Sequence, residues 1–113
     1  MKKLFLFVTL LSIIYSNIFS QGCLPEGITF TTQEQIDNFQ INYSGCTEIE
    51  GNVTISDNGS GNITNLNGLI VLTYIGGDFL IGSNYYEENS SLTTLSGLEN
   101  LTSIGGHLRI QWN

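Results

Sequence analysis

Residues 63–84 read ITNLNGLIVLTYIGGDFLIGSN, and residues 92–113 read LTTLSGLENLTSIGGHLRIQWN. The two segments align without a gap, and the residues that they share are mostly apolar residues and glycines. The residues of the first copy that recur in the second are Thr64, Leu66, Gly68, Leu69, Leu72, Thr73, Ile75, Gly76, Gly77, Ile81 and Asn84. Self-similarity of this length indicates a repeat protein, in which each copy buries its apolar face against the next.

An imperfect third copy lies upstream, where residues 46–58 read CTEIEGNVTISDN. Its Gly51 aligns with Gly77 and Gly106, and the row of glycines predicts a corner with either a positive φ or a close backbone approach. After each of these glycines, apolar residues alternate with outward positions, which predicts a strand with one buried face.

The stretch before each strand has a different period. Residues 66–75 read LNGLIVLTYI, in which every third residue from Leu66 is apolar. This period suits a tight, curved segment, and Gly68 argues against an ordinary helix. We therefore predict a mainly β fold, a right-handed parallel β-solenoid of the leucine-rich-repeat kind, with three coils over residues 46–113.

Each copy ends in an asparagine, and the row consists of Asn58, Asn84 and Asn113. We predict a structural ladder, in which each side-chain amide closes a turn and bonds the neighbouring copy. A line of ligand contacts is the alternative.

The first 20 residues have the layout of a secretory signal peptide, because Lys2 and Lys3 precede an apolar run over residues 4–14. The run is shorter than the ~20 residues that a membrane-spanning helix needs. We expect a secreted or cell-surface protein on the extracellular side, with no membrane insertion after signal cleavage. A lipoprotein anchored through Cys23 is the alternative.

Two cysteines, Cys23 and Cys46, remain after signal removal. An even number of cysteines in an exported chain predicts a disulfide between them. Between the cysteines, Thr32 and Gln35 form a capping-box pattern, which predicts a short helix over about residues 33–40. We expect this helix and the disulfide to form an N-terminal cap in residues 21–45.

The charge of the chain excludes several partners. The net charge is −7, and Arg109 is the only lysine or arginine outside the signal peptide. Such a chain repels phosphate backbones, so nucleic acid is excluded as a partner. With His107 as the only histidine and no phosphate-binding motif, we predict no catalytic, cofactor-binding or metal-ligating residues, and hence no enzyme.

Aromatic residues mark the candidate ligand contacts. Tyr85 and Tyr86 begin the longer connection between copies, and Trp112 lies at the aligned place of the next copy. Tyrosine and tryptophan are the residues that protein or sugar recognition favours. Packing on the connection itself is the alternative for these side chains. Residues 57–62, DNGSGN, are read as a turn, with weak calcium binding as the alternative.

The order of these features resembles a known family. A first cysteine, a capped helix, the segment C-x-x-I-x-G-N-V-x-I from Cys46 and the repeats are similar to the receptor L-domain, the ligand-binding leucine-rich β-helix of growth factor receptors. The near-perfect repeats are most similar to its secreted, Bacteroidetes-type surface versions. The resemblance covers residues 22–113 and implies a cysteine pair, a helical cap and ligand recognition without a kinase.

The function predicted from these features is a non-enzymatic exported or cell-surface recognition module that binds protein or glycan. Two alternatives are a structural spacer in a larger surface protein and the accessory domain of a secreted hydrolase. The apolar rows of the last copy lack a cover in the sequence, so we expect further coils or domains beyond Asn113.

Overall fold

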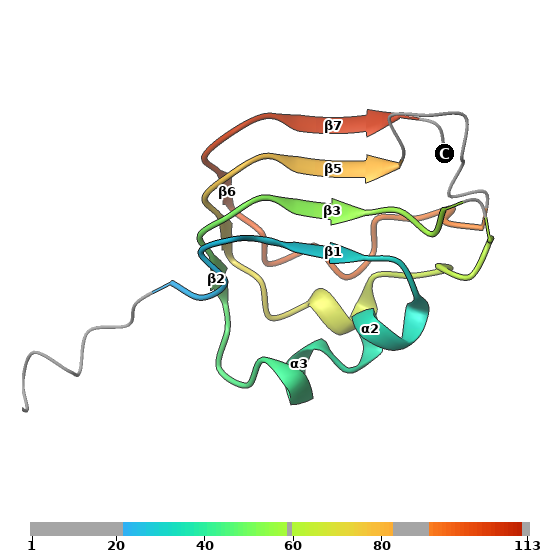
Figure 1. Ribbon diagram of the computed structural model, residues 1–113, viewed down its shortest axis with the longest axis horizontal. Helices are drawn as coiled ribbons and strands as arrows, with labels where there is room; N and C mark the ends of the chain where they lie inside the picture. The colour runs from blue at the N-terminus through green and yellow to red at the C-terminus, as the bar shows by residue number, and fades with distance from the viewer. Residues whose placement is uncertain (1–21, 59, 83–90, 112–113) are drawn as a thin grey trace, which may run out of the picture.

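The computed structural model describes residues 22–58, 60–82 and 91–111. Figure 1 shows the longer strands stacked beside one another, with the helices at one end of the stack. The elements in chain order are β1 (Ile28–Phe30), α2 (Gln33–Asp37), α3 (Phe39–Asn42), β2 (Glu48–Ile49), β3 (Val53–Ile55), the 3-10 helix η1 (Asn67–Leu69), β4 (Tyr74–Ile75), β5 (Phe79–Gly82), β6 (Ser103–Ile104) and β7 (Leu108–Gln111).

The strands form two parallel sheets, one in the order β1-β3-β5-β7 and one in the order β2-β4-β6. Each sequence copy contributes one strand to each sheet, and we call the pairs β2 with β3, β4 with β5, and β6 with β7 the three layers. The pairing follows the sequence alignment, because Val53 lies opposite Phe79 and Phe79 lies opposite Leu108. The alignment of the copies therefore predicts the strand register correctly.

The predicted right-handed parallel β-solenoid is wrong. The described residues form an α/β arrangement of two separate parallel sheets and two short helices, with no closed solenoid. The reason lies in the segments between the strands, since residues 66–72 contain η1 and turns in place of a further row of strands. The strands of the smaller sheet are also only two residues long, as in β2, and Gly76 and Gly77 follow β4 directly.

The core lies between the two sheets and the helices. The apolar residues at every third position of residues 66–75 point inward, as predicted, although the backbone there includes a 3-10 helix and turns. The fully buried residues of this stretch are Leu66, Leu69, Leu72 and Ile75. Strands β3 and β5 bury every second residue in the same core, which confirms the alternating pattern.

The N-terminal cap is built largely as predicted. The hydroxyl oxygen of Thr32 accepts a hydrogen bond from the backbone N–H of Gln35, and the Gln35 side chain accepts one from the backbone N–H of Thr32, which completes the capping box. The predicted single helix is divided at Asn38 into α2 and α3. The Cys23–Cys46 disulfide is present, with the two Cα atoms 5.7 Å apart. In the chain-entropy model, closing this loop stabilises the fold by about 3 kcal/mol.

Helix α2 is bonded to residues 64–65 through one side chain. The side-chain Oε1 atom of Gln33 accepts hydrogen bonds from the backbone N–H groups of Thr64 and Asn65, at 2.9 and 3.2 Å. Its amide nitrogen donates to the Asn65 carbonyl at 3.1 Å. The Gln33 side chain therefore bonds both donors and an acceptor of the backbone at residues 64–65, as a neighbouring strand does. These bonds hold the N-terminal cap against that segment. Within the described ranges, no helix is both long and apolar enough to cross a membrane.

Candidate binding surface on the four-stranded sheet

A row of hydrogen-bonding side chains lines the corner that precedes the larger sheet. The Oδ1 atom of Asn52 accepts a hydrogen bond from the backbone N–H of Asp78 at 2.8 Å. The Oδ1 atom of Asp78 accepts one from the backbone N–H of His107, also at 2.8 Å. The first and second layers therefore each offer a side-chain oxygen to the backbone of the next layer. We call Asn52, Asp78 and His107 the corner row.

The glycines before the corner row are required by close approach. A Cβ atom on Gly77 would collide with Oδ1 of Asn52, and one on Gly106 would collide with Oδ1 of Asp78. The φ angles of these glycines do not lie in the left-handed region. Of the two readings that the sequence left open for this row, the structure therefore shows the close approach of backbone and not a positive φ.

The outward residues of the sheet continue the surface that the corner row begins. Thr54, Leu80 and Arg109 lie opposite one another in neighbouring strands. Thr54 and Leu80 are partly buried, whereas Arg109 is exposed. We call these three residues together with the corner row the sheet face.

The sheet face encloses a shallow hollow of about 160 Å³. Its lining consists of Asn52, Val53, Thr54, Asp78, Phe79, Leu80, His107 and Arg109. Phe79 is 1% exposed, so its ring belongs to the core and offers no face to a ligand. The accessible chemistry of the hollow is therefore polar and charged around the side chain of Leu80.

The charges on the sheet face are mixed. Arg109 is the only lysine or arginine in the described part of the chain, and it shares the hollow with the carboxylate of Asp78 and the imidazole of His107. The net charge of the chain is −7. The guanidinium group of Arg109 thus lies in the same hollow as two hydrogen-bonding side chains, Asp78 and His107. Among the described residues, no group of three or more His, Cys, Asp or Glu side chains is placed to hold a metal ion.

The aromatic candidates cannot be placed on this surface. Tyr85, Tyr86 and Trp112 lie outside the described residues. Their role as ligand contacts stays a prediction.

The predicted asparagine ladder is represented by one residue, because Asn84 and Asn113 also lie outside the described residues. Asn58 is exposed in a turn with φ 55°, unlike the buried corner that the ladder implied. The neighbouring Asp57 is buried, and its Oδ2 accepts a hydrogen bond from the backbone N–H of Ile63 at 3.5 Å. Residues 57–62 therefore include a turn whose aspartate has a structural partner.

The corner row does not follow from the sequence patterns described above. A side-chain ladder was predicted at the end of each copy, but the structure places one at the start of each strand. The signal was present, since Asn52 and Asp78 both follow the aligned glycines and both carry an Oδ1 atom on Cγ. The substitution of His107 at the third position obscured the pattern.

The comparisons with known proteins add no assignment to this surface. Neither a protein-family model, nor a curated protein, nor a solved structure matches the chain.

Proposed function

We propose that this chain is a non-enzymatic recognition module that binds a protein ligand over the sheet face. One observation carries the proposal: Asp78, His107 and Arg109 line a single hollow together with the partly buried Leu80. An apolar centre with a polar and charged rim is the usual composition of a protein interface. Arginine is also among the residues that contribute most to binding at such interfaces.

The size of the hollow supports recognition of a large ligand. At about 160 Å³, it is smaller than the roughly 300–1,000 Å³ of sites that enclose a small molecule. One side chain of a partner would fill it, while the surrounding strands contact the rest of the partner. The alternatives, a spacer or the accessory domain of a secreted hydrolase, assign no binding role to Leu80.

A protein ligand suits the described surface better than a glycan. Sugar rings are commonly held against aromatic faces, and the only aromatic residue in the hollow, Phe79, is buried. A glycan would need Tyr85, Tyr86 or Trp112, which lie outside the described residues. The experiment below therefore includes glycans as a competing outcome.

Export to the extracellular side is part of the proposal. The Cys23–Cys46 disulfide supports it, because disulfides form and persist in oxidising compartments.

The test compares two substitutions of apolar residues by glutamate. The purified chain is used to select binders from a displayed peptide library and is applied in parallel to a glycan array. Leu80→Glu alters the sheet face, whereas Ile41→Glu alters α3, where Ile41 is 77% exposed. We expect peptides selected by the unchanged chain to lose at least tenfold in affinity for Leu80→Glu and to bind Ile41→Glu equally well.

Two results would contradict the proposal. The first is a set of peptides that bind Leu80→Glu as tightly as the unchanged chain, which would place recognition elsewhere. The second is binding to glycans alone, which would favour the glycan reading. Far-UV circular dichroism of both variants establishes that they retain the fold.

A further inference from the structure

Two asparagines of the chain, Asn58 and Asn67, are followed directly by glycine in the sequence. Asparagine is among the chemically labile residues of proteins. A glycine after it carries no side chain to shield its backbone nitrogen, so that nitrogen can reach the side-chain amide of the asparagine. Both asparagines are exposed. Exposure therefore does not distinguish them, but their backbone surroundings differ.

Asn58 lies in a surface turn between the first two layers. The backbone N–H of Ser60 donates to the Asp57 carbonyl at 3.1 Å, and the Ser60 hydroxyl donates to the same carbonyl at 2.7 Å. Asn58 is one of the two central residues of this four-residue turn, and its φ of 55° lies in the left-handed region, which asparagine tolerates better than most residues. Because Asn58 belongs to no helix or strand, its backbone can rotate once the turn bonds open.

Asn67 is held in a different way, as the first residue of η1. Its carbonyl accepts a hydrogen bond from the Ile70 N–H at 3.3 Å, and its own N–H donates to Oδ1 of Asn65 at 3.1 Å. A Cβ atom on Gly68 would collide with the backbone carbonyl of Ile36, which shows how closely η1 lies against α2. Rotation of the Asn67 backbone would therefore have to separate η1 from the cap.

We propose that Asn58 is a site of spontaneous deamidation and isoaspartate formation, and that η1 protects Asn67 from the same reaction. The backbone nitrogen of residue 59 forms a bond with Cγ of Asn58, and the side-chain amide leaves as ammonia with the proton of that nitrogen. Water then opens the resulting succinimide ring at one of its two carbonyl groups. The product is either aspartate or isoaspartate, and the main chain of isoaspartate is longer because it runs through Cβ and Cγ. This reaction involves no ligand, so the inference goes beyond the proposed function.

Isoaspartate would lengthen a connection that positions core residues. Asp57 is buried, and its Oδ2 accepts a hydrogen bond from the backbone N–H of Ile63 at 3.5 Å. Ile63 and Leu66, which follow the turn, are fully buried. A longer main chain at Asn58 would move the Ser60 N–H away from the Asp57 carbonyl. We therefore expect the modified turn to lose its hydrogen bonds and to hold Ile63 less firmly.

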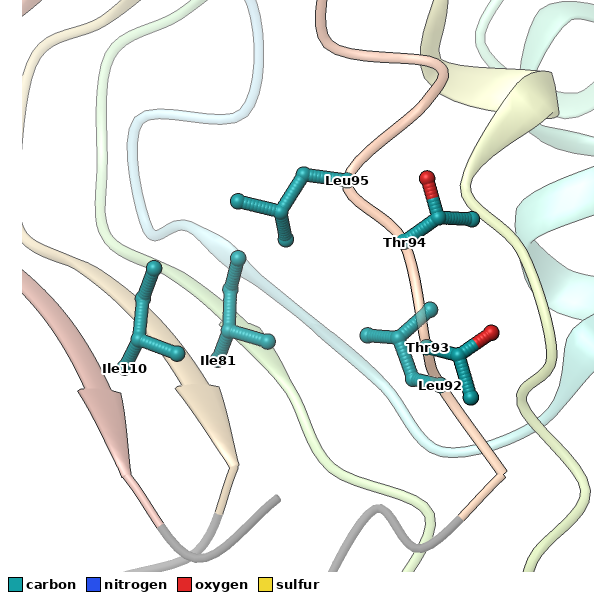
Figure 2. A pocket seen from close by; sticks show the side chains of 6 residues that line it. All are labelled: Ile81, Leu92, Thr93, Thr94, Leu95 and Ile110. Atoms are coloured by element: carbon teal, nitrogen blue, oxygen red, sulfur yellow. The ribbon is translucent and has the colours of Figure 1, made fainter.

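The second connection between layers is longer in the sequence, and the residues after it are packed more loosely. Leu92 aligns with Ile63 and is only partly buried, and Leu95 aligns with Leu66 and is 45% exposed. A hollow of about 190 Å³ lies beside these leucines, and its lining consists of Ile81, Leu92, Thr93, Thr94, Leu95 and Ile110. Figure 2 shows the two leucines directed across the hollow toward the isoleucines. A longer connection thus accompanies a less tightly filled core, which is the direction of change expected at the modified turn.

The test compares the two asparagines within one chain. The purified chain is kept in mildly alkaline buffer, either folded or unfolded in guanidinium chloride. Mass spectrometry of proteolytic peptides then follows the conversion of each asparagine with time. In guanidinium chloride we expect similar rates at Asn58 and Asn67, because each precedes a glycine. In the folded chain we expect Asn58 to react at least tenfold faster than Asn67.

Asn58→Gln is the matched control. The longer side chain would have to close a six-membered ring, so the conversion at this position should disappear while Asn67 behaves as before. Isoaspartate is identified by methylation with a protein isoaspartyl methyltransferase. The unchanged chain should unfold at a lower urea concentration after isoaspartate has accumulated, whereas Asn58→Gln kept for the same time should not.

Three results would overturn the inference. Equal rates at Asn58 and Asn67 in the folded chain would show that η1 gives no protection. A folded chain in which Asn58 does not react, although it reacts in guanidinium chloride, would show that the turn prevents ring closure. An unchanged urea midpoint in the chain that carries isoaspartate would show that the length of the turn does not affect the core.

Discussion

The side chain of Asn52 accepts a hydrogen bond from the backbone N–H of Asp78, and the backbone carbonyl of Asp78 accepts one from the N–H of Val53, both at 2.8 Å. At the junction between the first two layers, Asp78 therefore donates a hydrogen bond to Asn52 and accepts one from the next residue, Val53. Asn52 and Asp78 directly precede β3 and β5, and the acceptor there is a side-chain oxygen instead of a backbone carbonyl. The stability of the junction should depend on that one amide.

Replacement of the amide tests this dependence. Asn52→Ala removes the acceptor and should lower the free energy of unfolding by about 1 kcal/mol. Asn52→Asp retains an oxygen at the same place, as Asp78 does in the next layer, and should lose less. Urea denaturation followed by circular dichroism measures both changes. Equal losses for the two variants would show that the hydrogen bond contributes nothing.

Gly77 should be intolerant of any side chain. Its Cβ would collide with Oδ1 of Asn52 and lie 2.8 Å from the backbone nitrogen of the same residue. We expect Gly77→Ala to cost about 2–3 kcal/mol in thermal or urea unfolding. Gly45→Ala is the control, because no atom lies within 4 Å of its Cβ and its φ of 80° alone is unfavourable. The control should cost about 1 kcal/mol.

The same glycine provides a test of coupling. The clash of Gly77→Ala is partly with an atom that Asn52→Ala removes. The double variant should therefore be more stable than the sum of the single changes predicts, by at least about 0.5 kcal/mol. If the two losses of unfolding free energy add strictly in a double-mutant cycle, Gly77 and Asn52 are not energetically coupled.

The Gln33 side chain should matter more than other glutamines of the cap. Gln33→Ala removes three acceptor contacts and one donor contact to residues 64–65 and should cost about 1–2 kcal/mol. Gln40→Ala removes a single bond of 3.3 Å to the Gly68 carbonyl and should cost less than about 0.5 kcal/mol. Urea midpoints of the two variants give the comparison. A larger loss for Gln40→Ala would contradict the assigned role of Gln33.

Aligned leucines in successive layers should differ in their contribution to stability. Leu72 is fully buried, whereas Leu101 is only partly buried. Leu72→Ala should cost about 3 kcal/mol, as in other closed cores, and Leu101→Ala roughly 1 kcal/mol. Comparable losses, measured by differential scanning calorimetry, would show that the last layer is covered as completely as the second.

The features that could be predicted from the sequence are those in which local chemistry determines the structure. Thr32 and Gln35 form a capping box because both groups lie within one helical turn. The register of β3, β5 and β7 follows from the alignment of the copies, because each strand must bury the same face. The disulfide follows from two cysteines in a chain whose first residues predict export.

The period of the apolar residues alone could not distinguish a closed solenoid from the structure observed. An inward residue at every third position is compatible with a row of strands and with the 3-10 helix and turns that the structure contains, since both place Leu66, Leu69 and Leu72 in the core. The choice depends on where the backbone hydrogen bonds go, and residue patterns do not specify this. The corner row was missed for the same reason, because its bonds join a side chain to a distant backbone.

Chemical-shift mapping by NMR is the most direct test of the central claim, that the sheet face is the surface for recognition. A peptide enriched by the unchanged chain is titrated into the isotopically labelled protein. The account predicts that the largest shift changes occur at Thr54, Leu80, His107 and Arg109, and that they vanish in Leu80→Glu. Shift changes confined to the strands of the smaller sheet or to α3, with none on the sheet face, would contradict it.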